Sequence, residues 1–305
     1  MPQSTRRLRS AGKLEVNAGE TSTPSSNDSL ATTPGPLDGP SVLAVAQPAT
    51  TVLQVVKPGA QLPGLEAPDL ALLRKKQRRL KAQAADRVSS LPNTSPEMRN
   101  ALEASLIFAQ HEAGSAVCID AAGWVLTCAH CIGETEEEYR ASPTRWLLFY
   151  TGLAVRIECR VWDAIRDLAL LKIIAVESVG TVLRFPFLRA STRSPVLRAP
   201  IVCIGQPGQD DLESTSARRT NYPFLEISEG MFRGMIPGAD PHNNSEIGTL
   251  KHDAWTYWGH SGAPLILAAD GTLIGLHSSW DDKTAMRHGV PHEAIVAFLK
   301  MNLNV

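Results

Sequence analysis

Gly259-His260-Ser261-Gly262-Ala263-Pro264-Leu265 places a serine between two glycines, and a proline and an apolar run follow it. Glycine adopts left-handed backbone conformations and lets another group approach closely. The backbone N–H groups of Gly259 and Ser261 could therefore point together at a developing oxyanion. A serine hydroxyl alone is a weak nucleophile. This stretch predicts a reactive serine only if the chain also supplies a base and a group that orients that base.

His130 is the candidate base. It comes three residues after the end of the apolar segment Trp124–Thr127, shortly before an Ile-Gly break. Imidazole titrates near neutrality, so it can take a proton from a serine and later return it. The chain has 8 histidines, so the residue type alone does not select this one. Its place at the end of an expected strand favours it.

Asp167 is the candidate group that orients the base. It opens the apolar run 168–173, and a carboxylate at the mouth of a strand can hold an imidazole N–H. Asp163 is the nearest competitor, but it lies in the preceding turn. The order His130, Asp167, Ser261 along the chain is the chymotrypsin order and differs from the orders in subtilisin and the α/β-hydrolases.

Short apolar segments separated by turn signals dominate the chain after Ile107, which indicates a β-barrel or a β-sandwich. A helix is expected from Pro291 to about Leu303. The predicted strands are Ser115–Ile119, Trp124–Thr127, Trp146–Tyr150, Val155–Val161, Leu168–Ile174, Ile201–Ile204, Leu225–Ser228, Gly262–Leu267 and Leu273–His277.

Several stretches carry a resemblance to a known family. They are Gly114–His130, Asp167–Ile173, Ile204–Gly208, Asp253-Ala254 followed by Gly259–Leu265, Gly271–Leu276 and Gly289–Pro291. With these motifs, residues 105–302 resemble the trypsin-like (chymotrypsin-fold) serine peptidases, and most of all the HtrA/Deg branch.

The resemblance implies an all-β domain of two six-stranded antiparallel β-barrels, with the site in the cleft between them and a C-terminal helix. It implies that His130 is the base, Asp167 its orienter and Ser261 the nucleophile. It also implies that the N–H groups of Gly259 and Ser261 form the oxyanion hole. The sequence stops soon after the expected helix, so the PDZ domains common in the HtrA branch are not expected.

Some positions depart from the family pattern. His260 stands where secreted digestive enzymes have an aspartate that pairs with a newly cut N-terminus, so activation by that route is not expected. Trp255 occupies the position at the base of the substrate pocket, Tyr257 adds bulk, and His277 and Ser278 would form the edge facing the substrate. These residues predict a small or apolar residue before the cut or a partly filled pocket; alternatively, the aromatic rings belong to the core of the second barrel.

The N-terminal third has a different composition. Residues 1–65 are rich in Ser, Thr, Pro and Gly and are expected to be a disordered extension. Within them, the more apolar patch Val42–Val56 is either a docking segment or an extra strand. Ser95 is expected to cap a short helix from Glu97 to about Leu106, at the start of a peptidase domain over 95–305.

Residues 66–90 are expected to form a basic helix over 67–88 and a linker. The run Arg74–Lys81 is open to two interpretations. It is either a patch for nuclear import or polyanion binding, or a solvated charged face of the helix.

Composition limits the remaining possibilities. The formal net charge is −1, so the chain as a whole gives no argument for nucleic acid or an anionic membrane, and it has no apolar run long enough for a transmembrane helix. The first residues lack the apolar core of a secretory signal. Mitochondrial targeting is the less favoured alternative, because Pro2, Gly12 and Gly19 disfavour the long amphipathic helix that a transit peptide needs.

The five cysteines are an odd number, which favours reduced thiols in the cytoplasm or nucleus. Cys128 and Cys131 have Cys-x-x-Cys spacing, but no second pair accompanies them, so neither a structural zinc site nor any cofactor is expected. The sequence predicts an intracellular serine endopeptidase that acts on polypeptides through an acyl-enzyme. The alternative is a catalytically weak peptidase-fold module that binds peptides or protein partners. The oligomeric state is left open.

Overall fold

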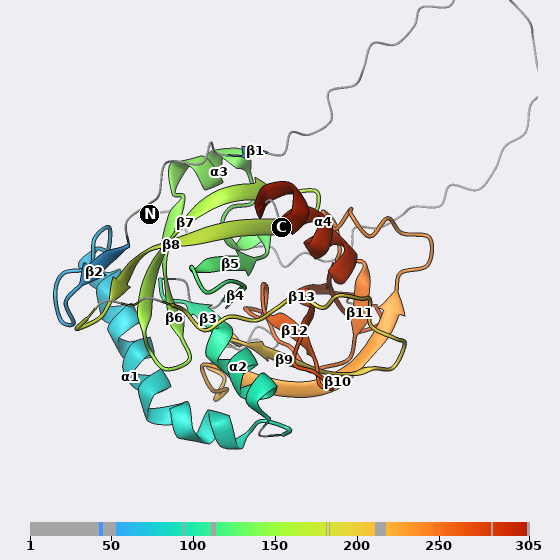
Figure 1. The fold of residues 1–305 in the computed structure, drawn as a ribbon, viewed down its shortest axis with the longest axis horizontal. Helices are drawn as coiled ribbons and strands as arrows, with labels where there is room; N and C mark the ends of the chain where they lie inside the picture. Colours follow the sequence, from blue (N-terminus) through green and yellow to red (C-terminus); the bar gives the residue numbers. More distant parts are fainter. Residues whose placement is uncertain are drawn as a thin grey trace, which may run out of the picture.

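The computed structural model describes residues 43–44 (backbone only), 53–93, 95–110, 114–180, 182, 184–210, 218–281 and 283–303. Within these residues the chain forms two closed antiparallel barrels of six strands each and ends in helix α4, His292–Leu303 (Figure 1). The predicted fold class and the C-terminal helix are therefore confirmed.

The first barrel has the strand order β7-β6-β3-β4-β5-β8 and closes through pairing of β7 with β8. Two further strands extend it: β1 (Leu43–Ala44) pairs with β7, and β2 (Gln54–Val56) runs parallel to β8. The barrel strands are β3 (Ser105–Phe108), β4 (Ser115–Cys118), β5 (Trp124–Thr127), β6 (Thr144–Phe149), β7 (Ala154–Asp163) and β8 (Leu168–Glu177).

The second barrel closes in the order β10-β11-β14-β13-β12-β9. Its strands are β9 (Pro200–Gly205), β10 (Glu226–Met235), β11 (Leu250–His252), β12 (Pro264–Leu267), β13 (Leu273–Trp280) and β14 (Arg287–Pro291). None of the helices in the described residues has both the length and the apolar character needed to cross a bilayer.

Three barrel strands, β3, β11 and β14, are absent from the predicted strands, although Gly289–Pro291 of β14 carries a motif of the family resemblance. The expected helix after Ser95 exists as α2 (Pro96–Ala104), and the Ser95 hydroxyl accepts a hydrogen bond from the Met98 N–H at 3.2 Å. Helix α2 ends earlier than expected because β3 begins at Ser105. The four-residue spacing from Leu102 to Leu106 matches a helical repeat, which is why the helix was expected to continue into the strand. Strand β11 has only three residues, which is too short for a recognisable alternation.

The N-terminal third contributes to the folded domain. Strand β2 lies inside the segment that was expected to lack structure, and its Val56 is buried. It fits the extra-strand interpretation of the patch 42–56. The rest of residues 1–52, apart from β1, falls outside the described residues.

Helix α1 (Ala67–Ser89) carries the basic run, yet one of its faces is buried. The buried side chains are Leu73, Lys76, Gln77 and Leu80, which follow the i, i+3, i+4, i+7 spacing of a core-facing stripe. Lys76 is 1% exposed, and its ammonium donates to the Phe108 carbonyl at 2.8 Å. Lys76 is therefore not part of a solvated face.

An ion pair between the half-buried Arg74 and the buried Glu177 fastens the same helix to the end of β8. Arg74 Nη1 lies 2.6 Å from Glu177 Oε1, and the Glu177 side chain is 3% exposed. Gln77 donates to Glu177 and to the Gly152 carbonyl, each at 2.8 Å. Although burial alone would raise the pKa of Glu177, hydrogen bonds from Gln77 and Arg74 lower it overall. The carboxylate is ionised and fully engaged.

The helix also reaches the segment that leads into β10. The Arg79 guanidinium lies 4.3 Å from the centroid of the Phe224 ring, and Arg87 donates to the Leu225 carbonyl at 3.3 Å. Helix α1 thus contacts both barrels. The exposed residues of the basic run are Lys75, Arg78 and Lys81, and for them polyanion contact stays a prediction.

Three of the buried histidines of the second barrel, His252, His260 and His277, lie close to one another. His252 Nε2 and His277 Nδ1 are 3.1 Å apart, and the ring centroids of His260 and His277 are 6.3 Å apart. Burial lowers the pKa of His252 to about 3 and that of His260 to about 4. Burial and the neighbouring histidines lower the pKa of His277 well below its ordinary value. All three rings are neutral at neutral pH.

We expect Arg74→Ala to lower the free energy of unfolding by about 3 kcal/mol, because it leaves the buried Glu177 carboxylate without its cation. Arg78→Ala is the matched control, since Arg78 lies on the same helix and is exposed. It should change the free energy by less than about 0.5 kcal/mol. Urea unfolding followed by circular dichroism measures both variants, and equal effects would contradict the role assigned to α1.

We expect the free energy of unfolding to fall as the pH drops below about 6.5, where the histidines of the unfolded chain become protonated. The folded chain keeps His252, His260 and His277 neutral down to their lowered pKa values, so the unfolded state binds more protons. Each such histidine contributes about 1.4 kcal/mol per pH unit in this window. Urea unfolding between pH 6 and 5 measures the slope, and a flat profile would contradict the expectation.

His252→Gln should reduce the slope of unfolding free energy against pH by the contribution of one histidine, about 1.4 kcal/mol per pH unit. His130→Asn is a suitable control, because the pKa of His130 is raised in the folded chain. His130 is protonated in both states below pH 6, and its stabilisation is lost only as the pH rises through its folded pKa.

Candidate active site

The predicted site residues come from both barrels. His130 lies in a single 3₁₀ turn, Ala129–Cys131, directly after β5, and Asp167 immediately precedes β8. Ser261 lies in the turn that leads into β12 of the second barrel. Asp167 has a φ of 53°, a left-handed conformation that aspartate tolerates better than most residues. The backbone of the proposed orienting residue, Asp167, therefore adopts an uncommon conformation.

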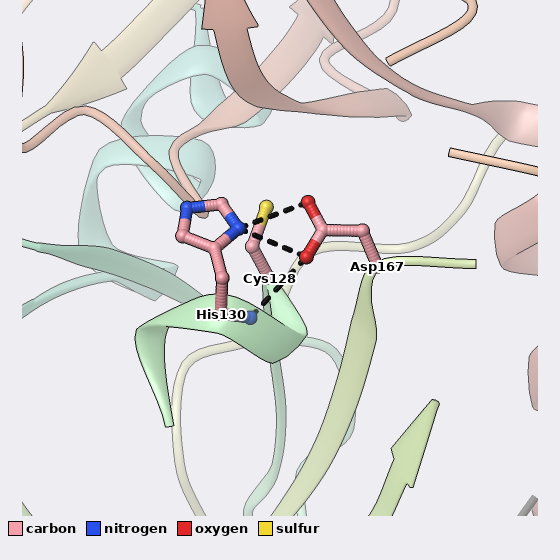
Figure 2. A group of neighbouring side chains, drawn as sticks. All are labelled: Cys128, His130 and Asp167. Carbon is pink, nitrogen blue, oxygen red and sulfur yellow. Dashed lines mark hydrogen bonds and ion pairs between the residues drawn. The ribbon is translucent and has the colours of Figure 1, made fainter. Parts of the chain in front are cut away.

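The structure brings His130 and Asp167 into direct contact (Figure 2). His130 Nδ1 lies 2.9 Å from Oδ1 and 3.0 Å from Oδ2 of Asp167, and the His130 backbone N–H donates to Oδ1 at 3.2 Å. The Ser278 hydroxyl donates to Oδ2 at 2.7 Å. Asp167 is 2% exposed, and these contacts hold its carboxylate in place.

These contacts determine the protonation of His130. Burial alone would lower its pKa, but the Asp167 carboxylate and the nearby Cys131 raise it well above 6.5. The aspartate therefore stabilises the imidazolium, which is the form that appears when the histidine takes a proton.

The Ser261 hydroxyl donates to the Ser278 carbonyl at 3.2 Å. Among the described residues, no hydrogen bond joins it to the His130 ring. The carboxylate and the imidazole are thus already paired, while the serine hydroxyl is held by strand β13 of its own barrel.

In the turn around Ser261, the N–H groups of Gly259 and Ser261 have no acceptor in the described part of the chain. The Trp258 carbonyl accepts from the Gly208 N–H at 2.8 Å, and the His260 carbonyl accepts from the Ala263 N–H at 2.7 Å. In a trans peptide the N–H points opposite to the carbonyl. The N–H groups of residues 259 and 261 consequently point away from these two partners.

Ser115 of β4 ties the first barrel to this turn. Its N–H donates to the Ser261 carbonyl at 2.9 Å, and its hydroxyl donates to the Gly259 carbonyl at 3.3 Å. Gly262 has a φ of 81°, and a Cβ there would lie 2.1 Å from the Ser115 carbonyl oxygen. Glycine is required at 262 because the turn packs directly on the first barrel.

The predicted pocket residues form an aromatic cluster. The Trp255 ring stacks on Tyr257 with centroids 6.3 Å apart and meets Tyr222 edge-on at 4.9 Å. Tyr257 and His277 are buried, which favours the second-barrel-core interpretation for these two residues, whereas Trp255 is half-buried. At the expected base of the pocket, the rings of Trp255, Tyr257 and Tyr222 therefore contact one another.

One group of side chains could hold a metal ion. Donor atoms of Cys128, His130 and Asp167 all lie within 4.8 Å of one another. Across the described residues this is the one such group of three or more His, Cys, Asp or Glu side chains.

Sequence reasoning missed two contacts. Ser278 was predicted only as part of the substrate-facing edge, yet its hydroxyl holds Asp167. Ser115 is predicted as the start of a strand and as part of a motif, but not as a contact of the Ser261 turn in the other barrel. Neither contact has a local signal, because each partner lies more than 100 residues away along the chain.

No curated protein matches the chain. The chain is similar to the HtrA-type protease AlgW bound to a decapeptide, with 21% identity and a TM-score of 0.45 over 63% of this chain and 52% of that chain. It therefore spans about half the length of AlgW.

Two structures of Rv3671c are also similar at 15% identity. An inactive form of the protease has a TM-score of 0.49 over 68% of this chain and 92% of that chain. A serine-to-alanine mutant from M. tuberculosis H37Rv, also inactive, has a TM-score of 0.50 over 70% and 93%. At these identities the likeness concerns the fold alone.

A family model described as the trypsin-like peptidase domain matches residues 114–276. This range covers more than half of the 305 residues and contains His130, Asp167 and Ser261. The chain belongs to the trypsin-like peptidase family.

Proposed function

We propose that the protein is a serine endopeptidase that cleaves polypeptides through an acyl-enzyme. His130 takes the Ser261 proton as the serine attacks a peptide carbonyl, and it then protonates the leaving amine. Its Nδ1 faces Asp167, so Nε2 is the nitrogen that accepts the proton. Water repeats the cycle and releases the acyl group. The Ser261 hydroxyl must first turn from the Ser278 carbonyl toward the imidazole.

The observation that carries this proposal is the pair of N–H groups at Gly259 and Ser261. Both belong to one short turn around the nucleophile, and no described group accepts from either. Donors fixed in this way stabilise the negative oxygen of a tetrahedral intermediate without reorganisation. The short bonds between His130 and Asp167 support the same reaction.

The aromatic cluster supports an apolar or small residue before the cut. Trp255 contributes no charge to pair with a lysine or arginine substrate, and its ring fills space next to His260, with centroids 5.6 Å apart. The five cysteines are unpaired and buried, which supports action in a reducing compartment, the cytoplasm or nucleus.

We expect Ser261→Ala to abolish labelling by a fluorophosphonate probe and to lower peptide hydrolysis by at least about 10⁴-fold, because the nucleophile is lost. In-gel fluorescence and a quenched-peptide assay measure the two effects. Ser194→Ala is the control, since Ser194 is exposed and donates to Glu293, which is not one of the proposed site residues. Wild-type protein that is never labelled would contradict the enzyme proposal.

The alternative is a peptide-binding module with little activity, which the bond from Ser261 to Ser278 favours. Peptide titration separates the two functions. Equal binding by wild type and Ser261→Ala, without hydrolysis by either, would support the module.

A randomised peptide library should give cleavage mainly after small or apolar residues, because the expected pocket base holds an uncharged ring. Mass spectrometry of the products identifies the cut sites. Cleavage after lysine or arginine would overturn the specificity proposal while leaving the chemistry intact.

A further inference from the structure

A thiol lies beside the proposed base and its carboxylate. Cys128 precedes the 3₁₀ turn that carries His130, and Figure 2 draws its sulfur between the imidazole and the carboxylate. The sulfur, a ring nitrogen of His130 and a carboxylate oxygen of Asp167 lie within 4.8 Å of one another. Serine peptidase chemistry needs the histidine and the aspartate, but it has no use for this thiol.

We propose that Cys128, His130 and Asp167 bind one zinc ion, and that this ion reversibly inhibits the protein. A thiolate, an imidazole and a carboxylate are the donors that zinc takes in proteins. Its bond lengths of about 2.0–2.3 Å place the donors of a tetrahedral site about 3.5 Å apart. The present separations, from 2.9 Å between Nδ1 and Oδ1 to at most 4.8 Å, lie on both sides of that value.

The charges balance. The carboxylate of Asp167 and a thiolate at Cys128 together neutralise a divalent ion, with His130 as the neutral third ligand. In the metal-free protein the thiol donates to the His277 carbonyl at 3.4 Å. Its proton passes to solvent as the sulfur–metal bond forms. A neutral cluster suits a site in which Cys128 is fully buried and Asp167 is 2% exposed.

The thiol also determines which metal binds. Sulfur ligands favour zinc over magnesium and calcium, which prefer sites built from oxygen alone. The His130 side chain is 17% exposed, so an ion can enter from the side of the imidazole. Three protein ligands leave a fourth position for water.

Metal binding would stop the proposed reaction by disabling His130, the proposed catalytic base. A zinc ion bound to His130 Nδ1 uses the lone pair of that nitrogen, so the neutral imidazole carries its proton on Nε2. That nitrogen can no longer accept the Ser261 proton, and Asp167 no longer orients the ring. This inhibition rests on the proposed function, whereas metal binding itself does not.

The binding test uses the full-length protein and cobalt(II) as a spectroscopic substitute for zinc. We expect one equivalent of cobalt to give a thiolate-to-metal charge-transfer band in the near ultraviolet, which zinc then displaces. Cys128→Ala and Cys128→Ser should lose the band and weaken zinc binding, measured by calorimetry, by at least about 100-fold. Absence of the band from wild type, or its survival in a folded Cys128 variant, would overturn the proposal.

Cys159→Ala is the matched control. Cys159 is also buried in the first barrel, but its thiol bonds the Val161 carbonyl within β7. This variant should keep both the band and the affinity. Circular dichroism establishes that each variant is folded, and the serine variant preserves the side-chain volume if alanine does not fold.

The inhibition test measures peptide hydrolysis with and without zinc, each variant against its own zinc-free rate. Zinc should inhibit wild type and Cys159→Ala, a chelator should restore the rate, and the Cys128 variants should need at least about 100-fold more zinc. Hydrolysis that persists in wild type saturated with zinc would overturn the inhibition. A protein that binds zinc but never hydrolyses peptide would overturn the proposed function and keep the metal site.

Discussion

The hydrogen bonds that Ser115 makes to the turn of Ser261 are the contact on which the rest of the site depends. His130 and Asp167 belong to the first barrel and Ser261 to the second, so their distances are set by how the barrels meet. Ser115 holds the two barrels together here through hydrogen bonds from its N–H and its hydroxyl. Gly262 lacks a side chain and so lets the Ser261 turn lie directly against Ser115. The Ser278 hydroxyl adds a second link, from β13 back to Asp167.

The protein handles buried polar groups in two ways. Near α1, burial is compensated by pairing: Glu177 meets Arg74 and Gln77, and Lys76 meets a carbonyl. In the second barrel, burial instead keeps the histidines uncharged. The position before the nucleophile illustrates the difference. His260 stays neutral and accepts a hydrogen bond from the Tyr257 N–H at 3.1 Å, within its own turn. An aspartate at this position would be charged and would need a cation as its partner.

Features that are local in sequence were predictable. The strands β4 and β5, the Ser95 cap and the positions of His130, Asp167 and Ser261 each have a motif of a few residues. The links between them were not predictable, because Ser278 meets Asp167 only after the barrels have closed. Helix α1 is an intermediate case. Its basic run suggested a surface, while the spacing of Leu73, Lys76, Gln77 and Leu80 already described a stripe that faces a core.

The way α1 is attached has a consequence for the covalent continuity of the chain. The linker that follows α1 includes Pro92 and Asn93, both exposed, whereas the helix itself is held by an ion pair, buried hydrogen bonds and apolar contacts. A single cut in that linker would therefore yield two fragments that stay together without a covalent connection. Noncovalent contacts hold the helix on the barrels. The linker adds only a high effective concentration of the helix near the barrels.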